Sequence, residues 1–274
     1  MCRHKGYTPD KVIHMKQWDV AEDERDDDSY YATAYMQPAL TAGLPIILRD
    51  KEGQNISIDA FWGILPVWEH DFQTARSKAA NFVNIRSETV YESRLYAPLI
   101  KKKQRCLIPC SFYFEHHQFD KRGKKGQVLK AKESVPFVVT AYRRPLFAVP
   151  ALYSKWYDRE NKREIVTYSM FTIVANDLLT AVHNGGDNPY RMPLVMERNM
   201  EDVWLNPEAP EKQINEILNY QVHSNLLRAH AVAPLTGKDA KQGEDIIREQ
   251  DWGAYNPEIE EIINTGKTQT SVLV

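Results

Sequence analysis

The second residue of the chain, Cys2, carries the most distinctive potential chemistry. If the initiator Met1 is removed, which the small side chain of Cys2 permits, this residue presents a free α-amine and a thiol on adjacent carbons. An amine condenses with an aldehyde to give an imine, and a neighbouring thiolate can add to that imine and close a five-membered thiazolidine. With pKa values of about 7.7 to 8.0 for the amine and about 8.5 for the thiol, both nucleophiles exist at neutral pH. Cys2 could therefore trap an aldehyde, although a terminal cysteine with nothing around it is more often inert.

Length and composition limit the class of protein. The 274 residues, 43% of them hydrophobic, can bury the core of one large domain or two small ones. The formal charge is -2, whereas a protein that coats nucleic acid carries a net positive charge. A local basic cleft is still compatible with this charge. Three cysteines without regular spacing, and no apolar signal segment after Met1, indicate a reducing, cytoplasmic setting. No apolar run approaches the roughly 18 residues of a membrane span, so we expect no membrane partner.

Apolar runs of strand length, separated by turn signals, dominate the chain. The acidic run within residues 18–29 is predicted to be a solvated loop, because its like charges would repel in a packed element. Pro109 is expected to kink its strand, and Asn176 is placed to cap a short helix. Predicted strands cover residues 46–48, 56–65, 105–115, 136–140, 146–152, 165–174, 191–196 and 227–232. Predicted helices cover 75–81, 92–104, 176–182 and 210–220, with a further helical patch at 259–263.

A cluster of metal-ligand types falls within a dozen residues and could suggest zinc. It consists of Cys106, Cys110, His116 and His117. On a strand, residues four apart lie roughly 13 Å from one another, whereas zinc needs each thiolate at about 2.3 Å. The spacing therefore favours core packing for Cys106 and a surface loop for the histidines, and we expect no metal.

Two residues could move protons. Glu115 ends an apolar, aromatic strand, where desolvation should raise the proton affinity of its carboxylate, although a solvated strand end is an equally good interpretation. His183 lies between a helix end and a glycine-rich turn, where a side chain can be held and partly exposed. A histidine in that position can also serve only as a capping or packing group.

Further polar and aromatic groups could contact nucleic acid. Asn84 and Arg86 would point to one face of an extended segment and could grip a sugar and a phosphate. The alternative is a structural Asn turn followed by a surface Arg-Glu pair. Trp62 and Trp68 flank a glycine and a proline and could stack on bases, but as bare residues they are better interpreted as core aromatics.

These stretches, in this order, resemble the SRAP domain proteins, the SOS response-associated peptidases. The resemblance covers most of residues 2–235, and five blocks in order beside a cysteine at position 2 make it fairly specific. It departs from the family pattern where seven residues, 184–190, separate His183 from Arg191. The motifs that carry it are Met1-Cys2, residues 62–68 (WGILPVW), 84–89 (NIRSET), 105–109 (RCLIP) leading to 112–115 (FYFE), and 191–193 (RMP) after His183.

The resemblance implies recognition of abasic sites in single-stranded DNA, and covalent capture of the sugar aldehyde by Cys2 as a thiazolidine. It further implies that Asn84 orients the sugar or the amine, and that Glu115 and His183 move protons. Lyase activity and autopeptidase removal of Met1 also follow from it, with no cofactor and with the protein as a monomer. The DNA-binding residues it suggests are Arg3, Arg86, Arg191, Trp62 and Trp68.

We therefore predict an α+β fold, a curved, largely antiparallel, barrel-like sheet with flanking helices. A single domain would cover residues 2–235, followed by a polar C-terminal extension over 236–274. Two other functions remain open from the residues: an N-terminal-nucleophile peptidase, and a non-catalytic module that binds single-stranded DNA with Cys2 idle.

Overall fold

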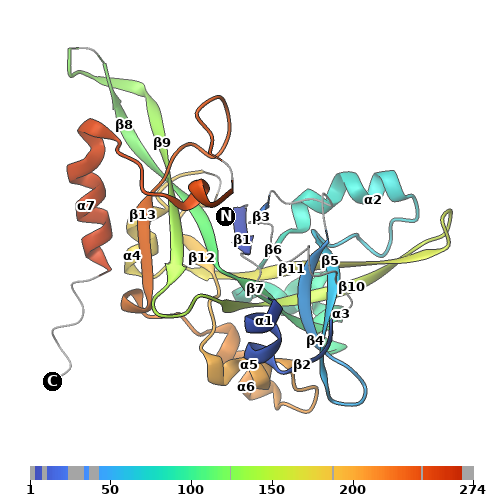
Figure 1. The fold of residues 1–274 in the computed structure, drawn as a ribbon. Helices are drawn as coiled ribbons and strands as arrows, with labels where there is room; N and C mark the ends of the chain where they lie inside the picture. The colour runs from blue at the N-terminus through green and yellow to red at the C-terminus, as the bar shows by residue number, and fades with distance from the viewer. Residues whose placement is uncertain are drawn as a thin grey trace, which may run out of the picture.

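The computed structural model describes most of the chain (Figure 1). Cys2, Arg3 and the acidic residues 24–29 lie outside the described residues, so the predictions that concern them have no structural counterpart. The described ranges are 4–7, 11–23, 34–36, 43–123, 125–186, 188–241 and 243–266.

Two sheets make up the β structure. One has the order β13-β9-β8-β1-β3, and the other has the order β12-β11-β10-β7-β4-β5-β2, with β6 beside β11. Because β11 pairs with β5 as well as with β10, the five strands β11, β10, β7, β4 and β5 close on themselves as a small barrel. The strands are β1 (His4–Tyr7), β2 (Val20–Asp23), β3 (Ala34–Met36), β4 (Leu44–Arg49), β5 (Asn55–Trp62), β6 (Asn84–Arg86), β7 (Arg105–Cys110), β8 (Phe112–Arg122), β9 (Val128–Ala141), β10 (Phe147–Asp158), β11 (Arg163–Val174), β12 (Arg191–Pro193) and β13 (Leu227–Ala231).

The predicted fold class is confirmed. Most strand pairs are antiparallel, and among the described strands only the pairs of β5 with β2 and β11, and of β6 with β11, are parallel. Every residue of β7 is buried, as its unbroken apolar run from Cys106 indicates, whereas β13 alternates buried and half-buried residues because only one of its faces meets the core.

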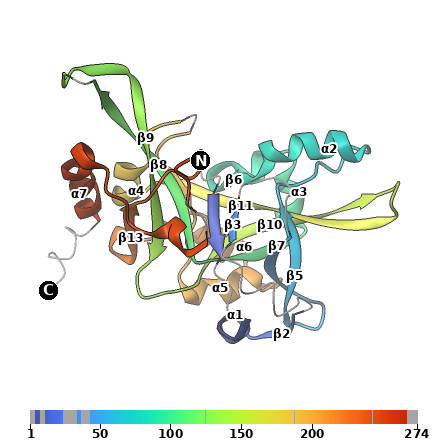
Figure 2. The same cartoon turned by 45° about the horizontal axis from the view of Figure 1, so that its top comes forward.

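Helices flank the sheets and cover their apolar faces. Helices α5 and α6 pack together below the barrel, and α4 and α7 lie against the five-stranded sheet (Figures 1 and 2). Among the described residues, no helix is long and apolar enough to span a membrane. The helices are α1 (Lys11–Trp18), α2 (Phe72–Ala79), α3 (Tyr96–Lys101), α4 (Asp177–Val182), α5 (Arg198–Leu205), α6 (Glu211–Leu218) and α7 (Asn256–Thr265).

Three local predictions need correction. The expected acidic loop begins instead with β2, because Trp18 and Val20 are buried and anchor the segment beside β5 before the charges accumulate. The chain turns at Ser111 rather than at Pro109, which stays in β7 opposite Ala148 of β10. The predicted helix over 92–104 is confined to α3, preceded by a 3-10 turn over Ser87–Glu92.

Part of the chain beyond residue 235 packs back onto the five-stranded sheet. The amide of Gln250 donates to the carbonyl of Ala231, and the indole of Trp252 donates to the carbonyl of Val232. Ile259 and Ile262 of α7 are buried in the main core. This segment therefore contributes apolar surface to the fold as well as polar residues.

Helix α4 positions the start of the loop that carries His183, and Asn176 fixes its first turn. The Asn176 amide oxygen accepts from the Leu179 N–H, and its nitrogen donates to the Val222 carbonyl in a buried setting. We expect Asn176→Ala to lower the free energy of unfolding by about 1 to 3 kcal/mol, since it removes a cap and leaves the buried carbonyl unpaired. Urea denaturation measures this change.

Asp71→Ala provides the matched control, because Asp71 caps α2 through Thr74 at an exposed site. The expected loss there is smaller, because water can take the place of the lost cap at an exposed site. Equal losses in the two variants would mean that the bond to Val222 adds nothing to the cap.

Candidate functional site

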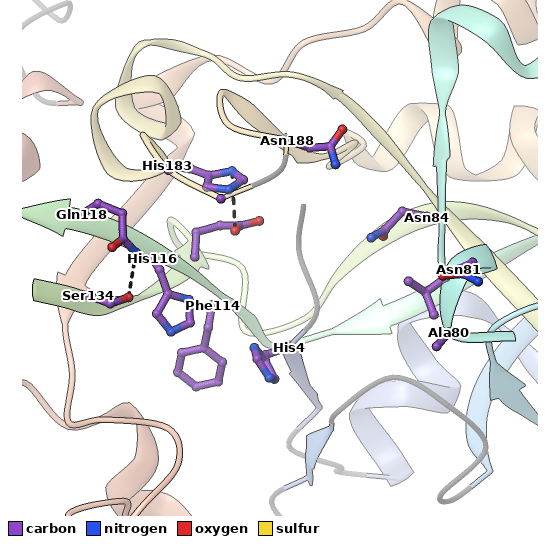
Figure 3. A pocket seen from close by; sticks show the side chains of 14 residues that line it. His4, Ala80, Asn81, Asn84, Phe114, His116, Gln118, Ser134, His183 and Asn188 are labelled. Atoms are coloured by element: carbon purple, nitrogen blue, oxygen red, sulfur yellow. Dashed lines mark hydrogen bonds and ion pairs between the residues drawn. The ribbon is translucent and has the colours of Figure 1, made fainter. Parts of the chain in front are cut away.

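A pocket of about 390 Å³ lies where the two sheets meet (Figure 3). Strand β8 forms one wall, the segment leading into β6 forms the other, and the loop after α4 closes the top. The pocket brings together three residues predicted as a site from sequence, Asn84, Glu115 and His183. The full lining is His4, Ala80, Asn81, Val83, Asn84, Phe114, Glu115, His116, Gln118, Ser134, His183, Gly185, Gly186 and Asn188.

Glu115 is the buried acid of this pocket. Its side chain is on β8 and only 3% exposed, and burial raises its pKa from 4.5 to about 8. Oε2 lies 3.6 Å from Nδ1 of His183, and Oε1 has no hydrogen-bond partner among the described residues. At neutral pH the carboxyl group is therefore largely protonated and has a proton to donate to a molecule in the pocket.

His183 is the base beside it. It terminates α4, where its backbone N–H donates to the Leu179 carbonyl, and its ring Nδ1 lies 2.8 Å from the Arg191 carbonyl oxygen. Since a carbonyl only accepts, we assign the proton to Nδ1, which leaves Nε2 of the neutral ring as an acceptor. Burial lowers the pKa of His183, which favours this neutral form.

Asn84 enters from the opposite wall, on the short strand β6. That strand is held parallel to β11, with Asn84 opposite Met170. The indole of Trp62 donates to the Val83 carbonyl at 2.8 Å, and the Ile64 N–H donates to the Phe82 carbonyl. Trp62 is 3% exposed, so it fixes the backbone that carries Asn84, which fits the interpretation as a core aromatic better than base stacking.

His4 and His116 are pocket residues that the sequence reasoning did not identify. His116 was assigned to a surface loop, but it lies on β8, two residues from both Phe114 and Gln118, so all three share one face of the strand. His4 of β1 pairs with Phe114, and its ring lies 6.2 Å from that of His116. Burial, followed by the nearby His183, lowers the pKa of His116. The alternation of Phe114, His116 and Gln118 was the available signal.

His117 also lies on β8, outside the predicted loop. It faces away from the pocket, and its Nδ1 donates to the Ala181 carbonyl at 2.8 Å. The predicted core position of Cys106 is confirmed: Cys106 and Cys110 are both buried in β7, and burial raises the pKa of each thiol.

The predicted phosphate-binding arginines differ in accessibility. Arg191 is 8% exposed, and its guanidinium donates to both carboxylate oxygens of Glu88 and to the Thr172 carbonyl. It therefore joins β12 to β11 and to the segment after β6. Arg86 is exposed and donates to Asn188 at the pocket rim, so its charge is accessible to a ligand.

Trp68 lies on the surface, outside the residues that line the site. It is 37% exposed, and the guanidinium of Arg94 lies 5.0 Å from its ring centre. Its ring is thus available for stacking, unlike that of Trp62.

The fold and the site define a class of protein: a small closed barrel joined to a second sheet, with a buried acid-base pair at their junction beside the N-terminal strand. The family model for SOS response associated peptidase (SRAP) matches residues 1–238. The chain belongs to the SRAP family.

Individual relatives are more distant. The chain is 24% identical over 229 residues to the abasic site processing protein YoaM of Bacillus subtilis, covering 82% of this chain and 91% of that protein. It is 19% identical over 212 residues to the abasic site processing protein HMCES of Xenopus tropicalis, covering 74% and 61%. A crystal structure of a protein from Bacteroides thetaiotaomicron superposes with a TM-score of 0.69 at 19% identity, covering 91% of this chain and all of that one.

The raised pKa of Glu115 predicts a specific dependence of stability on pH. The folded chain keeps a proton on Glu115 that the unfolded chain has already lost, so this contribution disappears as pH rises through about 8. Between pH 7 and 9, where the histidines of both states are mostly neutral, we expect the loss of this proton to lower the free energy of unfolding by about 1 to 1.5 kcal/mol. Glu115→Gln should remove this decline in urea titrations.

An exposed carboxylate supplies the control for this measurement. Glu164→Gln, at a half-exposed side chain paired with Lys155, should follow the wild-type profile. If the profile of Glu115→Gln runs parallel to that of the wild type, Glu115 titrates at an ordinary pKa.

Proposed function

We propose that this protein binds single-stranded DNA and captures the aldehyde of an abasic site through Cys2, forming a thiazolidine cross-link that shields the lesion. The observation that carries the proposal is the 3.6 Å approach of Glu115 and His183 in a polar pocket that also includes His4, two residues from Cys2. Membership of the SRAP family and likeness to proteins named abasic site processing proteins support this substrate.

Chain connectivity is compatible with Cys2 as the nucleophile. Strand β1 is held against β8 with His4 opposite Phe114, the neighbour of Glu115. Two residues of extended chain span at most about 7 Å, so a chain continuing from His4 can deliver the Cys2 amine to the pocket. The reaction requires prior removal of Met1, because only then is the α-amine that of Cys2.

Capture of the aldehyde takes place in three steps, addition of the amine, loss of water and ring closure. The α-amine adds to the aldehyde carbon to give a carbinolamine, which loses water to form an imine. The Cys2 thiolate then adds to the imine carbon, the nitrogen takes up a proton, and the ring closes with one water released overall. Amine attack also permits β-elimination on the 3′ side, so lyase activity is expected as a side reaction.

The pocket supplies the proton transfers that these steps need. The protonated carboxyl of Glu115 donates to the departing hydroxyl, and Nε2 of neutral His183 accepts the hydroxyl proton when the sugar ring opens. Asn84 on the opposite wall can orient the sugar or the amine by hydrogen bonding. Arg86 at the rim, and Arg3 beside Cys2 in sequence, offer charge to phosphates, whereas the existing bonds of Arg191 restrict it to an indirect role.

A peptidase acting on its own N-terminus is the second candidate function, favoured by the family description and by the same acid beside the chain start. A non-catalytic module that binds single-stranded DNA is the third, and it assigns no task to the Glu115 oxygen that lacks a partner among the residues described. Covalent capture is preferred because it uses both that acid and the terminal nucleophile.

Cys2→Ala provides the first test of capture. Incubated with an oligonucleotide that contains an abasic site, the wild-type protein should form a shifted band that survives heat and denaturant, and Cys2→Ala should form none. Reversible binding by both proteins without any cross-link would reject capture in favour of the binding module. Intact mass is measured in parallel, since retention of Met1 only in Cys2→Ala or Glu115→Ala would indicate self-processing.

Glu115→Gln tests the proton-donor role. Removing a general acid should slow formation of the adduct by roughly 10² to 10⁴-fold. In the wild type the rate should fall as pH rises past about 8, where Glu115 loses its proton, and the variant should lack this descending limb. Single-turnover cross-linking from pH 6 to 9.5 measures both effects, and an unchanged descending limb in Glu115→Gln would assign it to another group.

A further inference from the structure

The hairpin formed by β8 and β9 extends well beyond the pocket. Gln118 and Ser134, which line the pocket, are opposite one another on these strands, and the Gln118 amide donates to the Ser134 hydroxyl. From that pair the hairpin runs on beyond the other strands of the five-stranded sheet (Figures 1 and 2). Most of its described residues from 120 to 132 are exposed.

Positive charge is concentrated on this projection. Residues 120–133 contain six lysines and arginines against two acidic residues, in a chain whose formal charge is -2. The rest of the protein is therefore clearly acidic, and the hairpin stands out as a local basic element beside the pocket. Such segregation attracts a polyanion to one place without making the whole protein basic.

Not all of these charges are engaged within the protein. Lys121 pairs with Glu133, and Lys132 pairs with Asp120 across the hairpin. Among the described residues, Lys125 and Lys130 form no ion pair, and both are exposed near the tip. Their charge is available to a partner.

The C-terminal segment braces the hairpin near the pocket, at Phe119, and again beside its turn, at Arg122. The ring of Phe119 lies 5.1 Å from that of Tyr255, and Arg122 lies 3.4 Å from Glu258 of α7. The packed part of the C-terminal segment therefore holds the direction in which the hairpin leaves the pocket.

We propose that the β8-β9 hairpin is a phosphate-binding arm that contacts the DNA strand on one side of a lesion held in the pocket. The inference rests on the proposed function and adds the position of the flanking contact. From Gln118 to the turn at Gly123 the strand rises about 17 Å, at about 3.4 Å per residue. One strand of B-form DNA advances about 3.4 Å per nucleotide, so the arm spans roughly five nucleotides of a stacked strand and fewer of an extended one.

The double variant Lys125→Gln/Lys130→Gln tests the arm in the full chain. The probe is a fluorescent single-stranded oligonucleotide with a reduced, non-reactive abasic site and ten nucleotides on each side, and the readout is Kd by anisotropy. We expect binding roughly 3 to 10-fold weaker at 50 mM salt, and a slope of log Kd against log salt lower by about 1.4, for two lost phosphate contacts. The matched control is Lys51→Gln/Lys212→Gln, which removes the same charge from exposed sites on the β4-β5 turn and on α6.

Shortening the oligonucleotide locates the contact. With one flank cut to two nucleotides, the difference between wild type and the hairpin variant should vanish, and with only the other flank cut it should persist. Three results would contradict the proposed phosphate-binding role of the hairpin. They are wild-type affinity in the hairpin variant, an equal loss of affinity in the control variant, and a difference between wild type and hairpin variant that persists when both flanks are cut.

A parallel assay with a reactive abasic site separates the two proposals. If the wild type cross-links and the hairpin variant binds DNA as tightly as the wild type, the phosphate-binding role of the hairpin is rejected and the proposed function stands. If the wild type binds DNA more tightly than the hairpin variant but forms no cross-link, covalent capture is rejected and the phosphate-binding role of the hairpin is supported. Absence of DNA binding by the wild type rejects both.

Discussion

The pairing of β1 with β8 is the constraint on which the site depends. A chain terminus is ordinarily frayed, and a nucleophile at residue 2 is useful only if the residues after it are fixed. Here His4 is opposite Phe114 and Gly6 is opposite Phe112, and Ser111 donates its N–H to the Gly6 carbonyl. Only glycine fits at position 6, because a Cβ there would lie 1.9 Å from the Phe112 ring. Lys5 is buried between the two sheets, within 5.6 Å of two aromatic ring centres, which completes the anchor.

Two buried carboxylates show how the surroundings decide between structural and chemical roles. Glu201 accepts from the Trp18 indole and from Arg144, so its desolvation is offset by partners, and it ties α5 to the start of the chain. Glu115 is equally buried, but one of its oxygens has no hydrogen-bond partner within the part of the chain that the structure describes, and it faces a pocket. Both pKa values are raised by burial, so the shift alone does not separate them. The hydrogen bonds made to described residues do separate them, because a buried acid with an oxygen left open to a pocket costs stability that a fully bonded structural carboxylate avoids.

Local chemistry made much of this molecule predictable from its sequence. Apolar runs bounded by turn residues located most strands, Asn176 marked the start of α4, and an acid at the end of an aromatic run indicated Glu115. Contacts between segments far apart in the sequence could not be predicted from these local patterns. Closure of the barrel depends on a pairing of β5 with β11 over more than a hundred residues, and Trp18 is buried because Glu201 accepts its indole N–H. Glu88, which binds the guanidinium of Arg191, is likewise remote in sequence. The sequence therefore predicted that this guanidinium could bind phosphate, whereas it is already bonded within the protein.

The segment between His183 and Arg191 is a closed excursion whose length has little effect on the spacing of the acid and the base. Tyr190 donates its N–H to the His183 carbonyl, and the His183 ring donates to the Arg191 carbonyl, so the chain leaves and returns at almost the same point. Lengthening such a closed excursion costs little entropy, since the loss grows only slowly with loop length. The excursion instead carries Asn184 to the backbone N–H of Gln118 and Asn188 to Arg86. An insertion at this position therefore alters the rim, where a ligand would be selected, while the acid and the base keep their separation.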